Sequence, residues 1–123
     1  MDPMPTVSLH SLAEYRAALA RHPAVLLFKH SPICPISTAA LREWEAFSAA
    51  HPGSPKLFVD VIADRPVARG LAQECGIAHA SPQAILFRGG RPVWDASHEA
   101  ITAAALSAAW GAAGAAPGPS DRG

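Results

Sequence analysis

The residues with the clearest chemical potential are Cys34-Pro35-Ile36-Ser37, which join an apolar run to a helix-like segment. Proline is favoured at the first position of a helix, so the sequence predicts that Cys34 is the N-cap residue. There its sulfur would face the unpaired backbone N–H groups of Ile36 and Ser37 and the positive end of the helix dipole. Both favour a thiolate, so we predict that Cys34 is a reactive nucleophile.

Ser37 lies one helical turn after Cys34, on the same side of the predicted helix. Its hydroxyl can donate a hydrogen bond to a thiolate but cannot form a disulfide, so the pattern predicts a monothiol site. The alternative is that Cys34 is a small buried residue that happens to precede a helix, as free cysteines often are buried. The junction between strand and helix, together with Pro35, favours the reactive role.

The other polar candidates have simpler explanations. Cys75 ends a predicted helix that should pack on the sheet away from Cys34, so a half-buried packing role is favoured over that of a resolving thiol. Lys29 and His30 could help to hold the thiolate, but polar residues at a strand end are more often solvated. For His98 we favour packing at a helix entry over a role as the base for Cys34.

Length and composition limit the possible functions. A chain of 123 residues that is half apolar builds one core, and its ten basic and ten acidic residues leave no net charge to attract nucleic acid or an anionic membrane. No apolar run approaches the roughly 20 residues of a membrane span, and the N-terminus has no signal-like segment. We therefore expect a cytosolic protein. Two cysteines predict neither a permanent disulfide in a reducing cytosol nor a metal site.

The elements that position Cys34 follow from the spacing of apolar residues. We expect strands at residues 6–9, 24–28 and 56–61, with the second covered on both faces. We expect helices from a cap at Ser11 to Pro23, from Pro35 to about residue 50, and over 65–75, ended by Gly76. Short strands at 84–87 and 92–94 flank a Gly89-Gly90 turn, which predicts a hairpin.

A last helix is predicted from a cap at Thr102 to residue 110. Residues 1–110 would then form one domain, and residues 111–123, rich in glycine, alanine and proline, a disordered tail.

This order of elements, with Ser81-Pro82 just before the hairpin, resembles the thioredoxin fold, an α/β fold with a central mixed β-sheet flanked by helices. The resemblance implies that Pro82 is cis and that Ser81 and Pro82 line the site beside Cys34. Taken alone, Pro82 would be expected to be trans, because only about one X-Pro bond in twenty is cis.

A closer resemblance is to the monothiol bacilliredoxins, the YtxJ-like family, over about residues 5–110. The motifs that carry it are Phe28 to Ser37 (FKHSPICPIS), Ser81 to Phe87 (SPQAILF), Trp94, Ser97-His98 and Ile101-Thr102. It implies a cytosolic oxidoreductase that removes bacillithiol from client proteins, with Cys34 as nucleophile. Pro35, Ile36, Ser37, Ser81 and Pro82 would surround it. The partners implied are bacillithiolated proteins and bacillithiol itself, a co-substrate rather than a bound cofactor.

One departure from dithiol thioredoxins concerns Phe28, which stands where they usually carry a buried acid, so water or the incoming thiol would have to move the proton. Two other functions stay open. An iron–sulfur cluster carrier of the monothiol glutaredoxin type usually has a small glycine where this chain has Pro35-Ile36. A non-catalytic redox adaptor would accept the small thiol without releasing clients.

Overall fold

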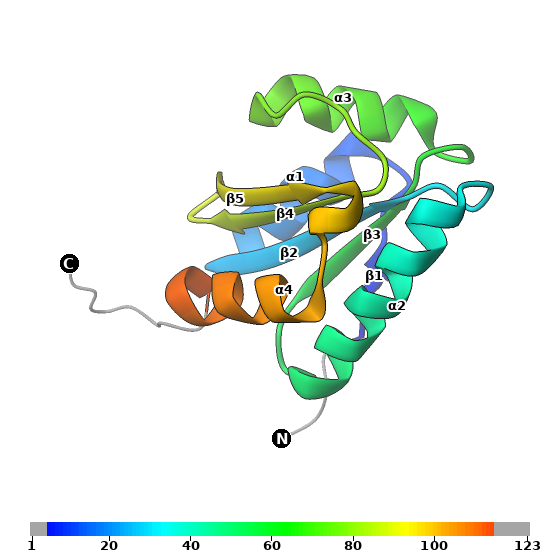
Figure 1. Cartoon of the computed structure of the whole chain (residues 1–123). Helices are drawn as coiled ribbons and strands as arrows, with labels where there is room; N and C mark the ends of the chain where they lie inside the picture. Colours follow the sequence, from blue (N-terminus) through cyan, green and yellow to red (C-terminus); the bar gives the residue numbers. More distant parts are fainter. Residues whose placement is uncertain (1–4, 115–123) are drawn as a thin grey trace.

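The computed structural model describes residues 5–114 and contains five strands with helices on both faces of the sheet (Figure 1). The strands are β1 (Val7–Ser8), β2 (Ala24–His30), β3 (Lys56–Asp60), β4 (Gln83–Arg88) and β5 (Arg91–Ser97). The helices are α1 (Leu12–Arg21), α2 (Pro35–Ala50), α3 (Arg65–Cys75) and α4 (Ala103–Ala109). A 3₁₀ turn, η1 (His98–Ala100), precedes α4, and a π-helical turn, η2 (Trp110–Gly114), follows it. The predicted α/β architecture is confirmed.

The sheet is mixed, with strand order β1-β3-β2-β4-β5. β1 and β2 both run parallel to β3, whereas β4 runs antiparallel to β2 and β5 antiparallel to β4. β2 is therefore the central strand, and its first six residues are buried. Its carboxyl end delivers the chain to Cys34 at the start of α2.

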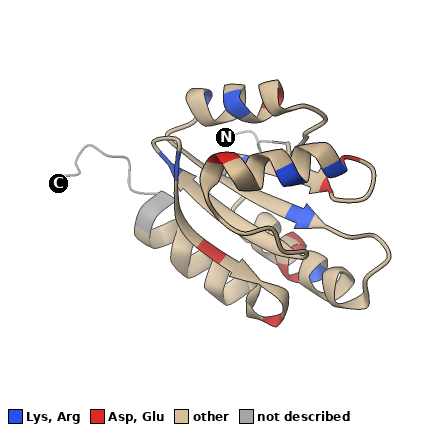
Figure 2. Cartoon of the chain, turned by 90° about the horizontal axis from the view of Figure 1, so that it is seen from above, with Lys and Arg blue, Asp and Glu red and all other residues tan. Residues whose placement is uncertain are grey.

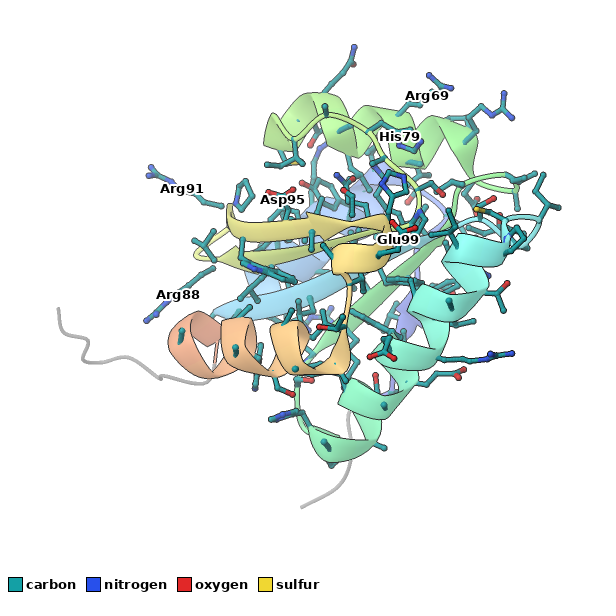
Figure 3. All side chains as sticks on the ribbon, viewed as in Figure 1. Arg69, His79, Arg88, Arg91, Asp95 and Glu99 are labelled. Atoms are coloured by element: carbon teal, nitrogen blue, oxygen red, sulfur yellow. The ribbon has the colours of Figure 1, made fainter. Side chains whose placement is uncertain are left out.

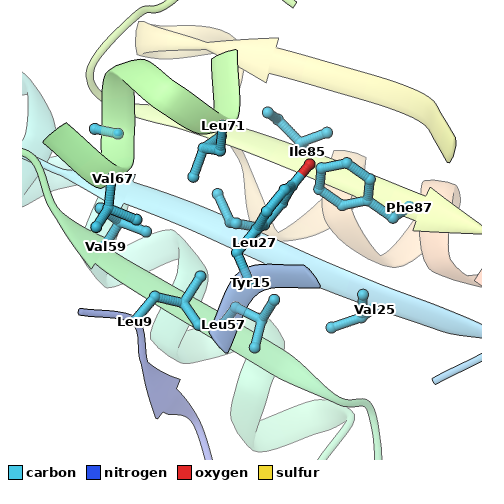
Figure 4. Packing of buried hydrophobic residues seen from close by; sticks show 11 residues of the cluster. Leu9, Tyr15, Val25, Leu27, Leu57, Val59, Val67, Leu71, Ile85 and Phe87 are labelled. Atoms are coloured by element: carbon cyan, nitrogen blue, oxygen red, sulfur yellow. The ribbon is translucent and has the colours of Figure 1, made fainter. Parts of the chain in front are cut away.

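Successive side chains of a strand point to opposite faces, and β2 therefore feeds two cores. Val25 and Leu27 pack towards α1 and α3, in a cluster around Tyr15 (Figure 4). Leu26 and Phe28 pack towards α2 and α4, where Phe28 stacks on Trp44 with ring centroids 5.2 Å apart. By the same alternation, Lys29 belongs to the α3 face and His30 to the α2 face.

Three predicted helix ends are confirmed. The Ser11 hydroxyl accepts a hydrogen bond from the N–H of Glu14, and that of Thr102 accepts one from the N–H of Ala105. Gly76 ends α3 in the left-handed region with φ of 77°, which costs glycine nothing because it lacks a Cβ.

The structure extends several predicted elements. β2 continues to His30, and β5 begins at Arg91 and ends only at Ser97, because the hairpin pairing persists from Arg88↔Arg91 to Gln83↔Ser97. The tail was expected to be disordered from residue 111, but η2 carries helical structure to Gly114, starting from the half-buried Trp110 that packs on the α2 and α4 core. Residues 115–123 lie outside the described residues.

Basic and acidic residues are interspersed along the helices and strands, as the colours of the ribbon in Figure 2 show, in line with the absence of net charge. Within residues 5–114, no helix has the length and apolar character needed to cross a membrane.

Candidate active site

Cys34 is the N-cap residue of α2 and Pro35 is at its first turn, as the sequence predicts. The thiol is free and half-buried. The backbone of Cys34 is held on both sides, because its N–H donates to the Ser31 carbonyl (3.2 Å) and its carbonyl accepts the Thr38 N–H (3.0 Å). The Cys34 side chain makes no capping hydrogen bond to the start of the helix.

Ser37 is fully buried and points into the protein beneath this turn. Its Oγ accepts the N–H of Ser31 at 2.9 Å and lies 2.7 Å from Nδ1 of His30. We expected this hydroxyl to face Cys34, but in the structure its hydrogen-bond partners are on β2 and the loop that follows it. Ser37 therefore connects the first turn of α2 to the end of the central strand.

His30 is the titratable group that this arrangement brings beneath the site. Its ring stacks on Phe28 (5.9 Å between centroids) and tilts against Phe58 (5.7 Å). Burial lowers the pKa of His30, while the carboxylate of Asp60 on the neighbouring strand opposes that shift. The imidazole is consequently neutral at physiological pH and able to accept a proton.

The Ser81–Pro82 peptide bond is cis, as the fold resemblance implies. The carbonyl of Pro82 accepts the N–H of His98 at 3.1 Å, which ties the end of β5 to this segment. His98 has a φ of 56°, an uncommon conformation for a residue with a Cβ. The Ser81 hydroxyl is buried and has no hydrogen-bond partner within the described chain.

Two open hollows flank a ridge that Pro35 and Ala39 form on α2. One, of about 450 Å³, is lined in addition by Pro32, Ile33, Cys34, Thr38 and Arg42. The other, of about 400 Å³, lies between α2 and the η1 segment and is lined in addition by Ile36, Ala40, Glu43, His98, Glu99, Ile101 and Thr102. Figure 3 labels Glu99 on η1, which faces the first turns of α2. The cysteine thus lies at one end of a surface hollowed on both sides.

Lys29 lies on the other face of the sheet and does not join this group. It is completely buried, and its ammonium donates to the side-chain carbonyl of Gln83 at 3.0 Å. Burial lowers the pKa of Lys29 to about 8, partly offset by Cys75 nearby. Cys75 itself is half-buried against the α1 and α3 core, on the face away from α2, as predicted.

The contact between His30 and Ser37 was not predicted, because the sequence indicates the position of each residue relative to Cys34 and not relative to the other. The alternation of β2 could have found it, since His30 shares the face of Phe28, which packs on α2. Within residues 5–114, no group of three or more His, Cys, Asp or Glu side chains is placed to hold a metal ion.

Comparison with known families places these features in context. The family model described as monothiol bacilliredoxin BrxC matches residues 7–106, which include Cys34, Ser37 and the Ser81–Pro82 bond.

Solved structures agree on the fold. A structure described as an oxidoreductase with a thioredoxin fold is 27% identical with a TM-score of 0.80, covering 85% of this chain and 92% of its own. A mutant thioredoxin from Halobacterium salinarum is 15% identical with a TM-score of 0.73, covering 96% and 98%. Mitochondrial thioredoxin 3 from Saccharomyces cerevisiae is 17% identical with a TM-score of 0.68, covering 85% and 92%. The fold is therefore thioredoxin-like.

Proposed function

Since the chain belongs to the monothiol bacilliredoxin family, we propose that it removes bacillithiol from protein mixed disulfides, with Cys34 as the nucleophile. The observation that carries this proposal is the position of Cys34 at the start of α2 with Ser37, not a second cysteine, one turn later. A helix start stabilises a sulfur anion, and the serine leaves the attacking sulfur without a resolving partner on the same helix.

The reaction is a thiol–disulfide exchange. The Cys34 thiolate attacks the bacillithiol sulfur of the mixed disulfide, and the client leaves as a thiolate that takes up a proton. Cys34 is then joined to bacillithiol. Free bacillithiol attacks this second disulfide, which restores the Cys34 thiolate and yields the disulfide of bacillithiol.

The surroundings of Cys34 suit a substrate with two unequal halves. Cys34 lines the hollow of about 450 Å³, and the second hollow lies on the other side of Pro35 and Ala39, so the small thiol and the client have separate places on this surface. Ile33 next to Cys34 is 79% exposed and Ile36 is 40% exposed, which offers apolar contact to a client chain. In this proposal Pro35 and Ile36 shape the helix start, and Ser81 and Pro82 are assigned to substrate binding, as the family resemblance implies.

Release of a client tests the proposal. A model protein with one cysteine is prepared in a bacillithiolated and a glutathionylated form, and each is incubated with this protein and excess free bacillithiol. We expect intact-mass spectra to show turnover of the bacillithiolated form and a bacillithiol adduct on Cys34. Equal release of both forms would refute the selectivity for bacillithiol, and release of neither would refute the activity.

The same preparation separates the two alternative functions. An adaptor would gain the bacillithiol adduct without catalytic release of the client. A cluster carrier would develop visible absorption after anaerobic reconstitution with iron and sulfide, and the Cys34→Ser variant would not.

A further inference from the structure

The hydroxyl of Ser37 connects the helix that begins at Cys34 to the imidazole of His30. Its Oγ accepts the Ser31 N–H at 2.9 Å and lies 2.7 Å from His30 Nδ1. A hydroxyl has one proton and two acceptor positions, so after Ser31 one acceptor position and the proton remain. If Ser37 donates its proton to Nδ1, the free acceptor position can take a proton from a third group. Ser37 is thus able to pass a proton to His30.

Cys34 is the group that can reach Ser37 from the other side. Residues three apart share one face of a helix, and the same spacing in a C-x-x-C motif allows two sulfurs to bond. The Cys34 side chain is not engaged in a capping hydrogen bond and is half-buried, so a rotation can turn its sulfur towards Ser37. The three side chains therefore form a possible path from sulfur to imidazole.

We propose that His30 accepts the proton of the Cys34 thiol through Ser37 in the reaction proposed above. His30 and Ser37 are then positioning residues for the attack, because in that step they act on the substrate only through Cys34. The S–H bond of Cys34 breaks as a new O–H bond forms on Ser37, while the original Ser37 proton moves to Nδ1. The products are a thiolate and an imidazolium. After the thiolate has displaced the client sulfur, the Cys34 sulfur is in a disulfide and no longer carries a proton, so the imidazolium returns its proton to Ser37, whose hydroxyl passes its own proton directly to the departing client thiolate.

The environment of His30 suits this role. Burial keeps the imidazole neutral before the transfer, and the Asp60 carboxylate of β3 is the charged group that faces it and favours the imidazolium afterwards. The rings of Phe28 and Phe58 hold its plane, while α2 contributes the neutral Ser37. Lys29, the adjacent residue on β2, projects to the opposite face of the sheet.

This inference replaces one expectation from the sequence. Because Phe28 stands where dithiol thioredoxins carry a buried acid, we expected only water or the incoming thiol to move the proton. The imidazole two residues later lies on the same face of β2 and supplies a titratable group there.

The chain contains a matched control pair. His51 Nε2 lies 3.1 Å from the hydroxyl of Ser107, and the His51 ring stacks on Phe47 at 4.8 Å. This second histidine–serine pair is at the carboxyl end of α2, about 26 Å along the helix from Cys34. It has the same chemistry and similar aromatic packing without access to the sulfur.

The first test measures the alkylation rate of Cys34 by iodoacetamide against pH, in a Cys75→Ser background and without bacillithiol. The unmodified site should show an added inflection at acidic pH from His30. His30→Phe keeps ring packing, and His30→Asn keeps a side-chain hydrogen-bond acceptor for the Ser37 hydroxyl but accepts no proton. Both, and Ser37→Ala, should lose this inflection and react about tenfold more slowly at pH 7, the order expected for one nearby charge. A His30→Asn profile that matches the unmodified site would overturn the proposal.

His51→Phe and Ser107→Ala should leave the same profile unchanged, and an equal loss in these variants would overturn the specific role of His30. A second measurement needs no substitution at the site. The ¹⁵N shifts of the His30 imidazole are titrated with Cys34 free and with Cys34 carbamidomethylated. By linkage, the midpoint should lie at higher pH when Cys34 is free, and identical midpoints would refute the transfer.

These results are independent of the proposed function. Coupled titration without release of a bacillithiolated client would refute the bacilliredoxin activity and leave the proton path intact. Release of the client without coupled titration of His30 and Cys34 would refute the proton path and leave the bacilliredoxin activity intact.

Discussion

Cys34 and Cys75 are both free and half-buried, but they occupy opposite kinds of helix end. Cys34 precedes the first turn of α2, where backbone N–H groups are unpaired and the helix dipole is positive. Cys75 is the last residue of α3, where carbonyl groups are unpaired and the dipole is negative. In general the start of a helix favours a nearby negative charge and its end disfavours one. The place of each cysteine in its helix, more than its exposure, therefore distinguishes the proposed nucleophile Cys34 from Cys75.

The two cysteines also lie on different faces of the sheet, and β2 gives each a different basic neighbour. His30 projects to the α2 face beneath the turn of Cys34, whereas Lys29 projects to the α3 face near Cys75. Two adjacent residues thus serve two separate environments, because side chains alternate along a strand.

The largest expected difference is in the rate of client release when each cysteine is replaced by serine. Cys34→Ser removes the nucleophile, so release of a bacillithiolated client should fall by roughly 10³-fold or more. Cys75→Ser should retain nearly the full rate, because Cys75 packs on the opposite face and a resolving thiol must come within disulfide distance. Intact-mass assays of client release measure both. A folded Cys75→Ser protein as inactive as Cys34→Ser would replace the monothiol mechanism with a dithiol one.

A second sulfur on the helix of Cys34 should change the course of the reaction. Ser37→Cys creates a C-x-x-C motif, and the new thiol should resolve the mixed disulfide of Cys34 as an intramolecular disulfide before free bacillithiol arrives. The oxidised variant should then lose two hydrogen atoms in mass and carry no adduct. Ser37→Ala is the control, since it removes the hydroxyl without adding a thiol. A persistent bacillithiol adduct on the Ser37→Cys protein would argue against proximity of the two positions.

The buried ammonium group of Lys29, which lies near Cys75, should make the free energy of unfolding depend on pH. Burial lowers the pKa of Lys29 to about 8, from 10.5 in an exposed lysine, so between these values the folded protein binds fewer protons than the unfolded chain. The free energy of unfolding should therefore rise as pH increases from about 8 to 10.5, by at most about 1.4 kcal/mol per pH unit.

Lys29→Met removes this group, so urea unfolding of the variant should lack that rise. Its absolute stability is a less direct measure, because the substitution also leaves the buried side-chain carbonyl of Gln83 without the Lys29 donor, although the Gln83 amide N–H still donates to the Ala78 carbonyl. The same slope in both proteins would show that Lys29 titrates normally.

The smallest effect concerns the left-handed residue after Cys75. Gly76→Ala meets no atom within 4 Å, but its φ of 77° disfavours a Cβ, so the free energy of unfolding should fall by about 1 kcal/mol. Client release should stay unchanged, because the proposed monothiol mechanism does not use Cys75. Gly111→Ala, also with open space around it and without a positive φ, is the control and should not destabilise the protein. Equal losses in stability would contradict the conformational explanation.

Much of the fold was predictable because local chemistry agrees with the final structure. Ser11, Thr102 and Gly76 end their helices as their residue types predict, and the continuous apolar run of β2 indicated a strand covered on both faces. The length of β5 was not predictable, since Arg91 to Ser97 alternates between exposed and half-buried residues and depends on pairing with β4.

The sequence by itself determined which residue is the candidate nucleophile, because the preference of proline for a first helical turn places Cys34 at the N-cap without any distant contact. Only the tertiary structure decided what surrounds it. The contact of Ser37 with His30, and the hollow between α2 and η1, join segments that are separate in the chain. Such contacts depend on which faces of a strand and a helix meet, and local propensity does not encode that choice.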